Sequence, residues 1–385
     1  MLQRLIAKIK KIDKIEKFNN KGLDIIEAII KVRIMDGIVK TKLPKGLKGR
    51  TGVISRKFIS HIPKEGDSII LTEKETSKFL EDDVQTKRIV ENEFLRAEVW
   101  DELGARIGSL VYKQKHIDIF NLYLSLQKSG SLYLGGILDT LSLEGTTDLW
   151  NKKYEYTSKG YEYKKGRFNL IKRITPLQNL PTIIIDYSAK SKTKKKLDLG
   201  QYIMIPAKGL GQDNVIYILL QDRIQQIRYW RYISPWPWSV DYAGLKLGGF
   251  LYVNESKCIC LGGFTQPDRL EVVRLYREPN GFNAVLMFKR EELKPNKSSE
   301  HRMLYILGES FYMDENGIAI FARDETNRGR IMVRSVRRPT YLQVSLDGKE
   351  KKIKLSSQII KGVGRFYISD YVPISAKIKG IVYEP

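Results

Sequence analysis

The sequence predicts an all-β protein built as an antiparallel sandwich or barrel, and three observations support this fold class. From residue 86 onward nearly every apolar run has the length of a strand, as in PTIIIDYSA, NVIYILLQ and RMLYILG. Turn residues separate these runs at short intervals, which favours antiparallel strands over alternating strand–helix units. No segment repeats with a fixed period, and this argues against a propeller.

Length and composition set the outer limits of the interpretation. A chain of 385 residues with 42% hydrophobic and 10% aromatic residues predicts two or three domains with buried cores. No apolar run approaches the roughly 18–20 residues that cross a bilayer. The lysine-rich start, MLQRLIAKIKKIDKIEKF, does not resemble a signal peptide, and Cys258 and Cys260 fit a reducing compartment. We therefore expect a cytoplasmic protein.

The formal net charge of +23 has two interpretations. Such an excess favours contact with polyanions, nucleic acid above all. A composition rich in Lys, Ile and Tyr is also typical of heat-adapted proteomes. The run Lys190–Lys196, KSKTKKK, has the same ambiguity, because it could follow a nucleic-acid backbone or be a solvated hairpin tip.

Residues 1–84 predict a small, basic, β-barrel-like domain of four or five short strands. Asp36-Gly37, between two alternating runs, predicts a tight hairpin, and Glu81-Asp82-Asp83 begins a linker. Such barrels often bind nucleic acid through a basic face, but they also occur as appendages. A stripe of apolar residues at steps of three and four predicts an amphipathic N-terminal helix docked on this domain. The stripe consists of Leu2, Leu5, Ile6, Ile9, Ile12 and Ile15.

Residues 86–325 contain the strands of the main sandwich, including a hairpin at Pro279-Asn280-Gly281. Residues 330–385 are again strand-rich, with a hairpin at Asp347-Gly348 and a bend at Gly362–Gly364. This tail is predicted to be a small β domain or the last strands of the sandwich.

Two stretches resemble a known family. VENEFLRAEVWDELGARIGSLVYK has an Asn-bearing strand start (Asn92) and a Gly104-Ala105 turn, where Gly104 allows a positive φ. It resembles the opening hairpin of galactose-mutarotase-like supersandwich domains. KGRFNLIKRITPLQNLPTIIIDYSAKSKTKKK is similar to that family's paired strands, which carry a charged rung. The resemblance covers roughly residues 87–320 and implies a supersandwich that handles sugars, as in epimerases, glycoside hydrolases and polysaccharide lyases.

The resemblance does not extend to the epimerase motifs. Epimerases of this family use two histidines and a late glutamate, whereas His116 and His301 lie in unrelated contexts, HID and HRM. The three histidines, with His61, are isolated from one another and from the cysteines, so we expect no metal site and no cofactor.

The segment RYWRYISPWPWS contains three of the five tryptophans. Indole rings stack on pyranose faces, and arginines bind hydroxyls or anions as planar forks. Pro235 and Pro237 exclude a central strand. The alternatives are tryptophans that plug the ends of the sandwich, or tryptophans that stack on nucleic-acid bases. The predicted ligand-binding residues are Arg228, Trp230, Arg231, Trp236 and Trp238.

Glycoside hydrolysis needs two carboxylates about 5–10 Å apart. The candidate catalytic acids are Asp139, Glu144, Asp222 and Asp241, each of which could instead be a turn or surface residue. The sequence therefore predicts a protein that binds a carbohydrate, including an anionic one, and leaves open whether it cleaves a bond. The alternative is a nucleic-acid-binding or structural scaffold protein with a basic surface.

Overall fold

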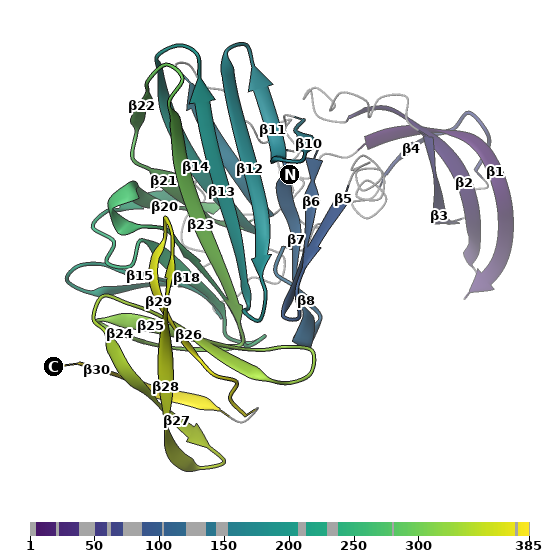
Figure 1. Ribbon diagram of the computed structural model, residues 1–385. Helices are drawn as coiled ribbons and strands as arrows, with labels where there is room; N and C mark the ends of the chain where they lie inside the picture. Colours follow the sequence, from purple (N-terminus) through teal and green to yellow (C-terminus); the bar gives the residue numbers. More distant parts are fainter. Residues whose placement is uncertain are drawn as a thin grey trace. The chain divides into compact units, whose positions relative to one another are not determined.

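A computed structural model describes residues 5–20, 23–37, 51–59, 63–71, 87–101, 104–120, 136–143, 153–206, 213–228, 238–278, 281–373 and 376–384. Antiparallel strands dominate these residues, which confirms the all-β prediction (Figure 1). The chain forms two compact units, of which residues 1–85 with 123–134 are the first and the remainder the second. Among the residues described, no helix is both long and apolar enough to cross a membrane.

The first unit contains a curved four-stranded sheet in the order β3-β2-β1-β4 (Figure 1). Its strands are β1 (Leu5–Asn20), β2 (Leu23–Gly37), β3 (Thr51–Ile59) and β4 (Ser68–Ile70).

The predicted N-terminal helix is wrong, because Leu5–Asn20 forms strand β1. The pairing of β1 with β2 shifts register after Ile6, after Ile9 and after Ile12. A β-bulge inserts one extra residue into a strand. The shifts after Ile9 and Ile12 each insert a residue into β1, so Ile9, Ile12 and Ile15 take equivalent paired positions at a spacing of three. This is the period that we interpreted as helical.

The tight hairpin at Asp36-Gly37 is also wrong. Ile6 pairs with Asp36 and Leu5 with Gly37, so both residues continue β2, and the next described strand starts at Thr51. The long strand β1 provides partners for these residues, and this overrides the local turn preference. The linker residues Glu81-Asp82-Asp83 lie outside the described residues.

The second unit contains the predicted sandwich, whose first layer is a ten-stranded sheet. The path of this sheet is β17-β20-β21-β14-β9-β7-β6-β5, with β22 beside β14 and β8 beside β7. Its strands are β5 (Lys87–Glu91), β6 (Leu95–Trp100), β7 (Arg106–Tyr112), β8 (Ile117–Asp118), β9 (Gly136–Leu143), β14 (Lys195–Pro206), β17 (Trp238–Tyr242), β20 (Leu270–Glu278), β21 (Gly281–Phe288) and β22 (Glu291–Leu293).

The second layer is a nine-stranded sheet in the order β10-β11-β12-β13-β23-β19-β18-β15-β16. Its strands are β10 (Glu155–Thr157), β11 (Gly160–Lys165), β12 (Phe168–Leu177), β13 (Thr182–Ser191), β15 (Asn214–Leu219), β16 (Ile224–Arg228), β18 (Gly249–Asn254), β19 (Ile259–Phe264) and β23 (Ser298–Gly308). The 3-10 turns are η2 (Lys113–Lys115) and η5 (Pro267–Arg269).

The third sheet contains the chain end and nearly closes on itself, since Tyr383 in its last strand donates a hydrogen bond to Asp314 in its first. The order is β24-β25-β26-β29-β28-β27-β30. β24 and β25, inside the predicted span 86–325, therefore belong to the same sheet as the tail, and β25 pairs with β26. Its strands are β24 (Ser310–Asp314), β25 (Gly317–Arg323), β26 (Gly329–Ser335), β27 (Pro339–Leu346), β28 (Lys349–Ile360), β29 (Gly364–Ser369) and β30 (Lys377–Tyr383).

The nine-stranded sheet is covered on one face by the ten-stranded sheet and on part of the other face by the third sheet. Ile183, Ile185 and Tyr187 of β13 face the core shared with the ten-stranded sheet. Ile184 faces a second core, shared with residues of the third sheet such as Met332. Strands buried on both faces need no polar alternation, which explains the continuous apolar runs in β13 and β23.

Candidate functional site

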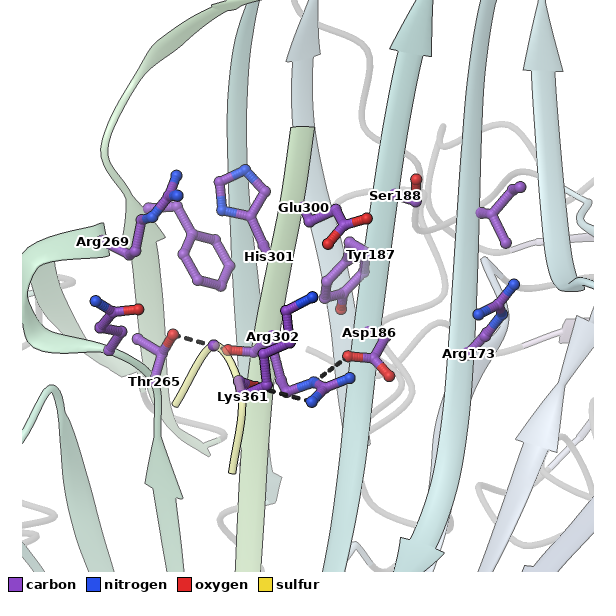
Figure 2. A pocket seen from close by; sticks show the side chains of 14 residues that line it. Arg173, Asp186, Tyr187, Ser188, Thr265, Arg269, Glu300, His301, Arg302 and Lys361 are labelled. Atoms are coloured by element: carbon purple, nitrogen blue, oxygen red, sulfur yellow. Dashed lines mark hydrogen bonds and ion pairs between the residues drawn. The ribbon is translucent and has the colours of Figure 1, made fainter. Parts of the chain in front are cut away.

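A pocket of about 450 Å³ lies on the face of the nine-stranded sheet that also carries the third sheet (Figure 2). Two rungs of side chains on β12, β13 and β23 form its floor. In register across the three strands, Arg173 pairs with Asp186, and Asp186 pairs with Arg302. The next rung consists of Ile171, Ser188 and Glu300.

Strand alternation places these side chains on the pocket face. Tyr187 points into the sandwich core, so its neighbours Asp186 and Ser188 point to the opposite face. Further along β13, Ile184 is buried against the third sheet. The third sheet therefore covers one part of this face, and the polar rungs occupy the part that remains open.

Two segments from other parts of the chain form the walls. Thr265, Gln266 and Arg269 come from the end of β19 and from η5, and Lys361 and Gly362 come from the turn between β28 and β29 (Figure 2). Arg302 joins floor and wall, because it forms an ion pair with Asp186 and donates a hydrogen bond to the Lys361 carbonyl at 2.8 Å. The pocket is thus shared between the sandwich and the third sheet.

The turn at Gly362 requires glycine. Its φ is +76°, and a Cβ there would lie 3.3 Å from the Cβ of Arg302. A larger residue would be strained and would push the Lys361 carbonyl away from Arg302.

Three charged side chains of the pocket are exposed. The side chains of Glu300, Arg269 and Lys361 form no hydrogen bond or ion pair with a residue that the structure describes, although the charge of Arg269 helps to lower the pKa of Glu291. The pocket lining contains four cationic side chains, Arg173, Arg269, Arg302 and Lys361, against the carboxylates Asp186 and Glu300. The pocket therefore offers planar donors and carboxylate acceptors to one ligand.

His301 also lines the pocket but packs toward the sandwich interior. Its ring lies 4.6 Å from that of Phe288, and its Nε2 is 2.6 Å from a carboxylate oxygen of Glu291. Burial acts to raise the pKa of Glu291, but hydrogen bonds from His301 and Ser299 outweigh it and the net pKa is lowered. Sequence reasoning excluded His301 from an epimerase motif and gave no sign of this pair.

Asp139, a predicted catalytic acid on β9, is fully buried between the two large sheets. Its carboxylate accepts hydrogen bonds from the Lys172 ammonium at 2.9 and 3.0 Å and from the Tyr187 hydroxyl at 2.6 Å. Gln201 donates to the same hydroxyl and accepts from Tyr305. Burial raises the pKa of Asp139 and lowers that of Lys172, and the attraction within the pair opposes both shifts. The network connects the sheets through the core.

Two other candidate acids, Asp222 and Asp241, form ion pairs with arginines and are not part of the Asp139 network. Asp222 lies in the exposed turn after β15 and pairs with Arg223. Asp241 on β17 forms two hydrogen bonds with Arg274 of β20, at 2.5 and 2.6 Å. These bonds lower the pKa of Asp241 and hold it ionised. Glu144 lies outside the described residues.

Asp241→Asn is expected to lower stability by at most about 1 kcal/mol at pH 7, because the pair is partly exposed. A carboxylate with a lowered folded pKa contributes stability above its unfolded pKa, about 3.9, and loses that contribution as the pH falls through the folded value. The difference between wild type and variant should therefore shrink as the pH falls below about 3.9 in thermal unfolding, and it should disappear only below the folded pKa. An equal difference at pH 6 and pH 3 would contradict the ion-pair account.

The five predicted ligand-binding residues of the tryptophan-rich segment form what we call the aromatic platform. Two of them, Arg228 and Trp238, lie within the described residues. Arg228 at the end of β16 is held by Glu255 through two hydrogen bonds, at 2.8 and 2.9 Å. Trp238 begins β17 opposite Arg277. Trp230, Arg231 and Trp236 lie outside the described residues, so the platform stays a prediction. In the Lys190–Lys196 run, Lys194 lies on the connection from β13 to β14, and its ammonium forms an ion pair with Glu292 of β22.

The chain matches no protein-family model and no curated protein. Among solved structures it is similar to an aldose epimerase homologue from C. elegans, with 11% identity over 58% of this chain and 99% of that one, and a TM-score of 0.41. It is also similar to a galactose mutarotase-like protein from Clostridium acetobutylicum, with 8% identity over 58% and 95% of the chains and a TM-score of 0.39. For a 4-alpha-glucanotransferase from Thermococcus litoralis the identity is 12%, the coverage 58% and 37%, and the TM-score 0.35.

Proposed function

We propose that the chain binds a saccharide in the pocket on the nine-stranded sheet. The observation that supports this is the set of unpaired donors and acceptors around one concavity, namely Arg269, Lys361 and Glu300 above the Arg173–Asp186–Arg302 rung. Sugar hydroxyls both donate and accept hydrogen bonds, so carboxylates beside arginines satisfy them at once. A volume of about 450 Å³ is within the usual range for small-ligand sites.

The rigidity of the floor supports the same proposal. The pocket side chains stand on three hydrogen-bonded strands, and Arg302 is fixed by Asp186 and by the Lys361 carbonyl. Groups that are already oriented lose little entropy on binding, which favours recognition of a flexible, hydrated ligand. The proposal concerns binding, and it assigns no bond cleavage to these residues.

Binding should be tested by titrating the intrinsic fluorescence of the full chain with a panel of neutral and acidic oligosaccharides. The double variant Arg269→Ala/Glu300→Gln is expected to bind at least tenfold more weakly, since each removed hydrogen bond to a charged group is worth about 1.5–3 kcal/mol. The matched control Arg338→Ala/Glu384→Gln removes an exposed pair of the same residue types that does not line the pocket. Equal affinities for both double variants would refute the proposed site.

A second candidate, nucleic-acid binding by the N-terminal sheet, is favoured by one observation. Lys8 lies directly opposite Arg33, and Lys11 lies opposite Lys31, on β1 and β2. Cationic residues at opposed positions of two neighbouring strands concentrate positive charge, which favours contact with the phosphates of a polyanion. Adding single-stranded DNA to the panel at low and high salt separates the candidates, because phosphate contacts weaken steeply with salt.

A further inference from the structure

A second pocket adjoins the first. It has a volume of about 560 Å³ and lies where β5, the edge strand of the ten-stranded sheet, adjoins the β10–β11 hairpin and β12. Arg173 lines both pockets. The two concavities are therefore neighbours along the same sheet, with one guanidinium group between them.

The charge of the second pocket differs from that of the first. Arg88, Lys159 and Arg173 line it, and no Asp or Glu is among its lining residues. The first pocket has two carboxylates. A ligand that spans both therefore meets charged groups of both signs at one end, and at the other end the charged lining groups are all cationic.

The second pocket also contains an exposed aromatic ring. Tyr156 is 53% exposed, and the guanidinium of Arg88 lies over its ring at 3.9 Å from the centroid. Arg88 is held there by a 3.0 Å hydrogen bond to Asp101. A half-exposed tyrosine next to fixed arginines is suited to a sugar ring that carries an anionic group.

Arg173 is oriented by its neighbour on the hairpin. Its Nε donates a 2.6 Å hydrogen bond to the Lys159 carbonyl, while its two Nη groups make no hydrogen bond with a described residue. Gly160 makes this approach possible, because a Cβ there would lie 2.9 Å from the Arg173 side chain. The outer edge of the guanidinium is thus the part presented to a ligand, as a planar fork that fits a carboxylate or a sulfate.

We propose that the two pockets are consecutive subsites for an acidic oligosaccharide, with Arg173 binding a carboxylate or sulfate group between them. This inference rests on the proposed saccharide binding in the first pocket. A nucleic acid fits the same surface less well, because the carboxylates Asp186 and Glu300 would repel a continuous row of phosphates.

The test uses the full chain on a glycan array of one to six sugar units that contains neutral, uronate-bearing and sulfated members, followed by calorimetry with the strongest acidic binder. We expect at least tenfold preference for acidic over neutral glycans of equal length, and rising affinity from one unit to three. Arg173→Gln should weaken binding of the acidic glycan at least tenfold more than binding of its neutral counterpart, and Arg173→Lys should retain part of the acidic preference. The control Arg223→Gln changes an exposed arginine that lines neither pocket.

The outcomes separate this inference from the proposed function. A neutral glycan that binds as tightly as its acidic counterpart overturns the acidic specificity but leaves saccharide binding intact. Unchanged acidic preference in Arg173→Gln overturns the role of Arg173. If single-stranded oligo(dT) binds in a way that depends on Arg173 and displaces the glycan, the two pockets form a nucleic-acid site and the acidic-oligosaccharide inference is overturned. Absence of binding to every glycan on the array overturns both proposals.

Discussion

Replacing Lys172 with methionine is expected to lower the free energy of unfolding by about 3–5 kcal/mol. Lys172 and Asp139 both have fully buried side chains, and the ammonium donates to both carboxylate oxygens. Removal of the cation leaves a buried carboxylate whose remaining hydrogen-bond donor, among the described residues, is the Tyr187 hydroxyl. The urea unfolding transition of the sandwich measures the loss.

Two comparisons isolate the buried charge as the cause. Lys164→Met breaks an exposed pair with Glu162 and should leave the urea midpoint nearly unchanged. Asp139→Asn combined with Lys172→Met removes both charges and should be more stable than Lys172→Met alone. A loss below about 1 kcal/mol for Lys172→Met would show that the pair is not a structural connection between the sheets.

Asn92→Ala is expected to destabilise the sandwich by about 3 kcal/mol, because it leaves several buried backbone groups without partners. The side-chain oxygen Oδ1 of Asn92 accepts hydrogen bonds from the backbone N–H groups of Phe94 and Leu95, at 2.9 and 3.0 Å. Its amide donates to the carbonyls of Leu177 and Leu180, at 2.7 and 2.8 Å. The side chain thus fastens the β5–β6 hairpin to the β12–β13 turn.

The control for this prediction is Asn169→Ala. Asn169 makes a single side-chain bond, to Glu162, among the described residues, and its loss should be about 1 kcal/mol. The same urea transition serves for both variants. Similar small losses for the two would mean that water replaces the Asn92 bonds and that the connection is not needed.

The sequence predicted those parts of the fold that depend on local pattern. Gly104 has a positive φ, as the turn in GARIG required, and Asp347-Gly348 joins β27 to β28 with positive φ at both residues. Asn92 stood at the start of the strand whose resemblance to a known hairpin suggested the supersandwich. The N-terminal strand failed because its bulges produce a helical period.

The pocket could be predicted only in part. The resemblance of KGRFNLIKRITPLQNLPTIIIDYSAKSKTKKK to paired strands implied a charged rung without naming its residues, and in the structure Arg173 and Asp186 form it. Arg302 and Lys361 come from far along the chain, and their arrival depends on strand order and on packing of the third sheet. Local sequence propensity determines neither the strand order nor the packing of the third sheet. The tryptophan segment attracted the functional hypothesis because its composition is unusual, whereas the pocket residues are ordinary strand residues.

The most direct measurement is the dissociation constant of one bound oligosaccharide for three proteins, namely wild type, Arg269→Ala/Glu300→Gln and Trp236→Ala/Trp238→Ala. Saccharide binding on the nine-stranded sheet predicts at least a tenfold loss in the pocket variant and less than a twofold change in the tryptophan variant. A tenfold loss in the tryptophan variant with an unchanged pocket variant would contradict it and would place the ligand on the segment that follows β16.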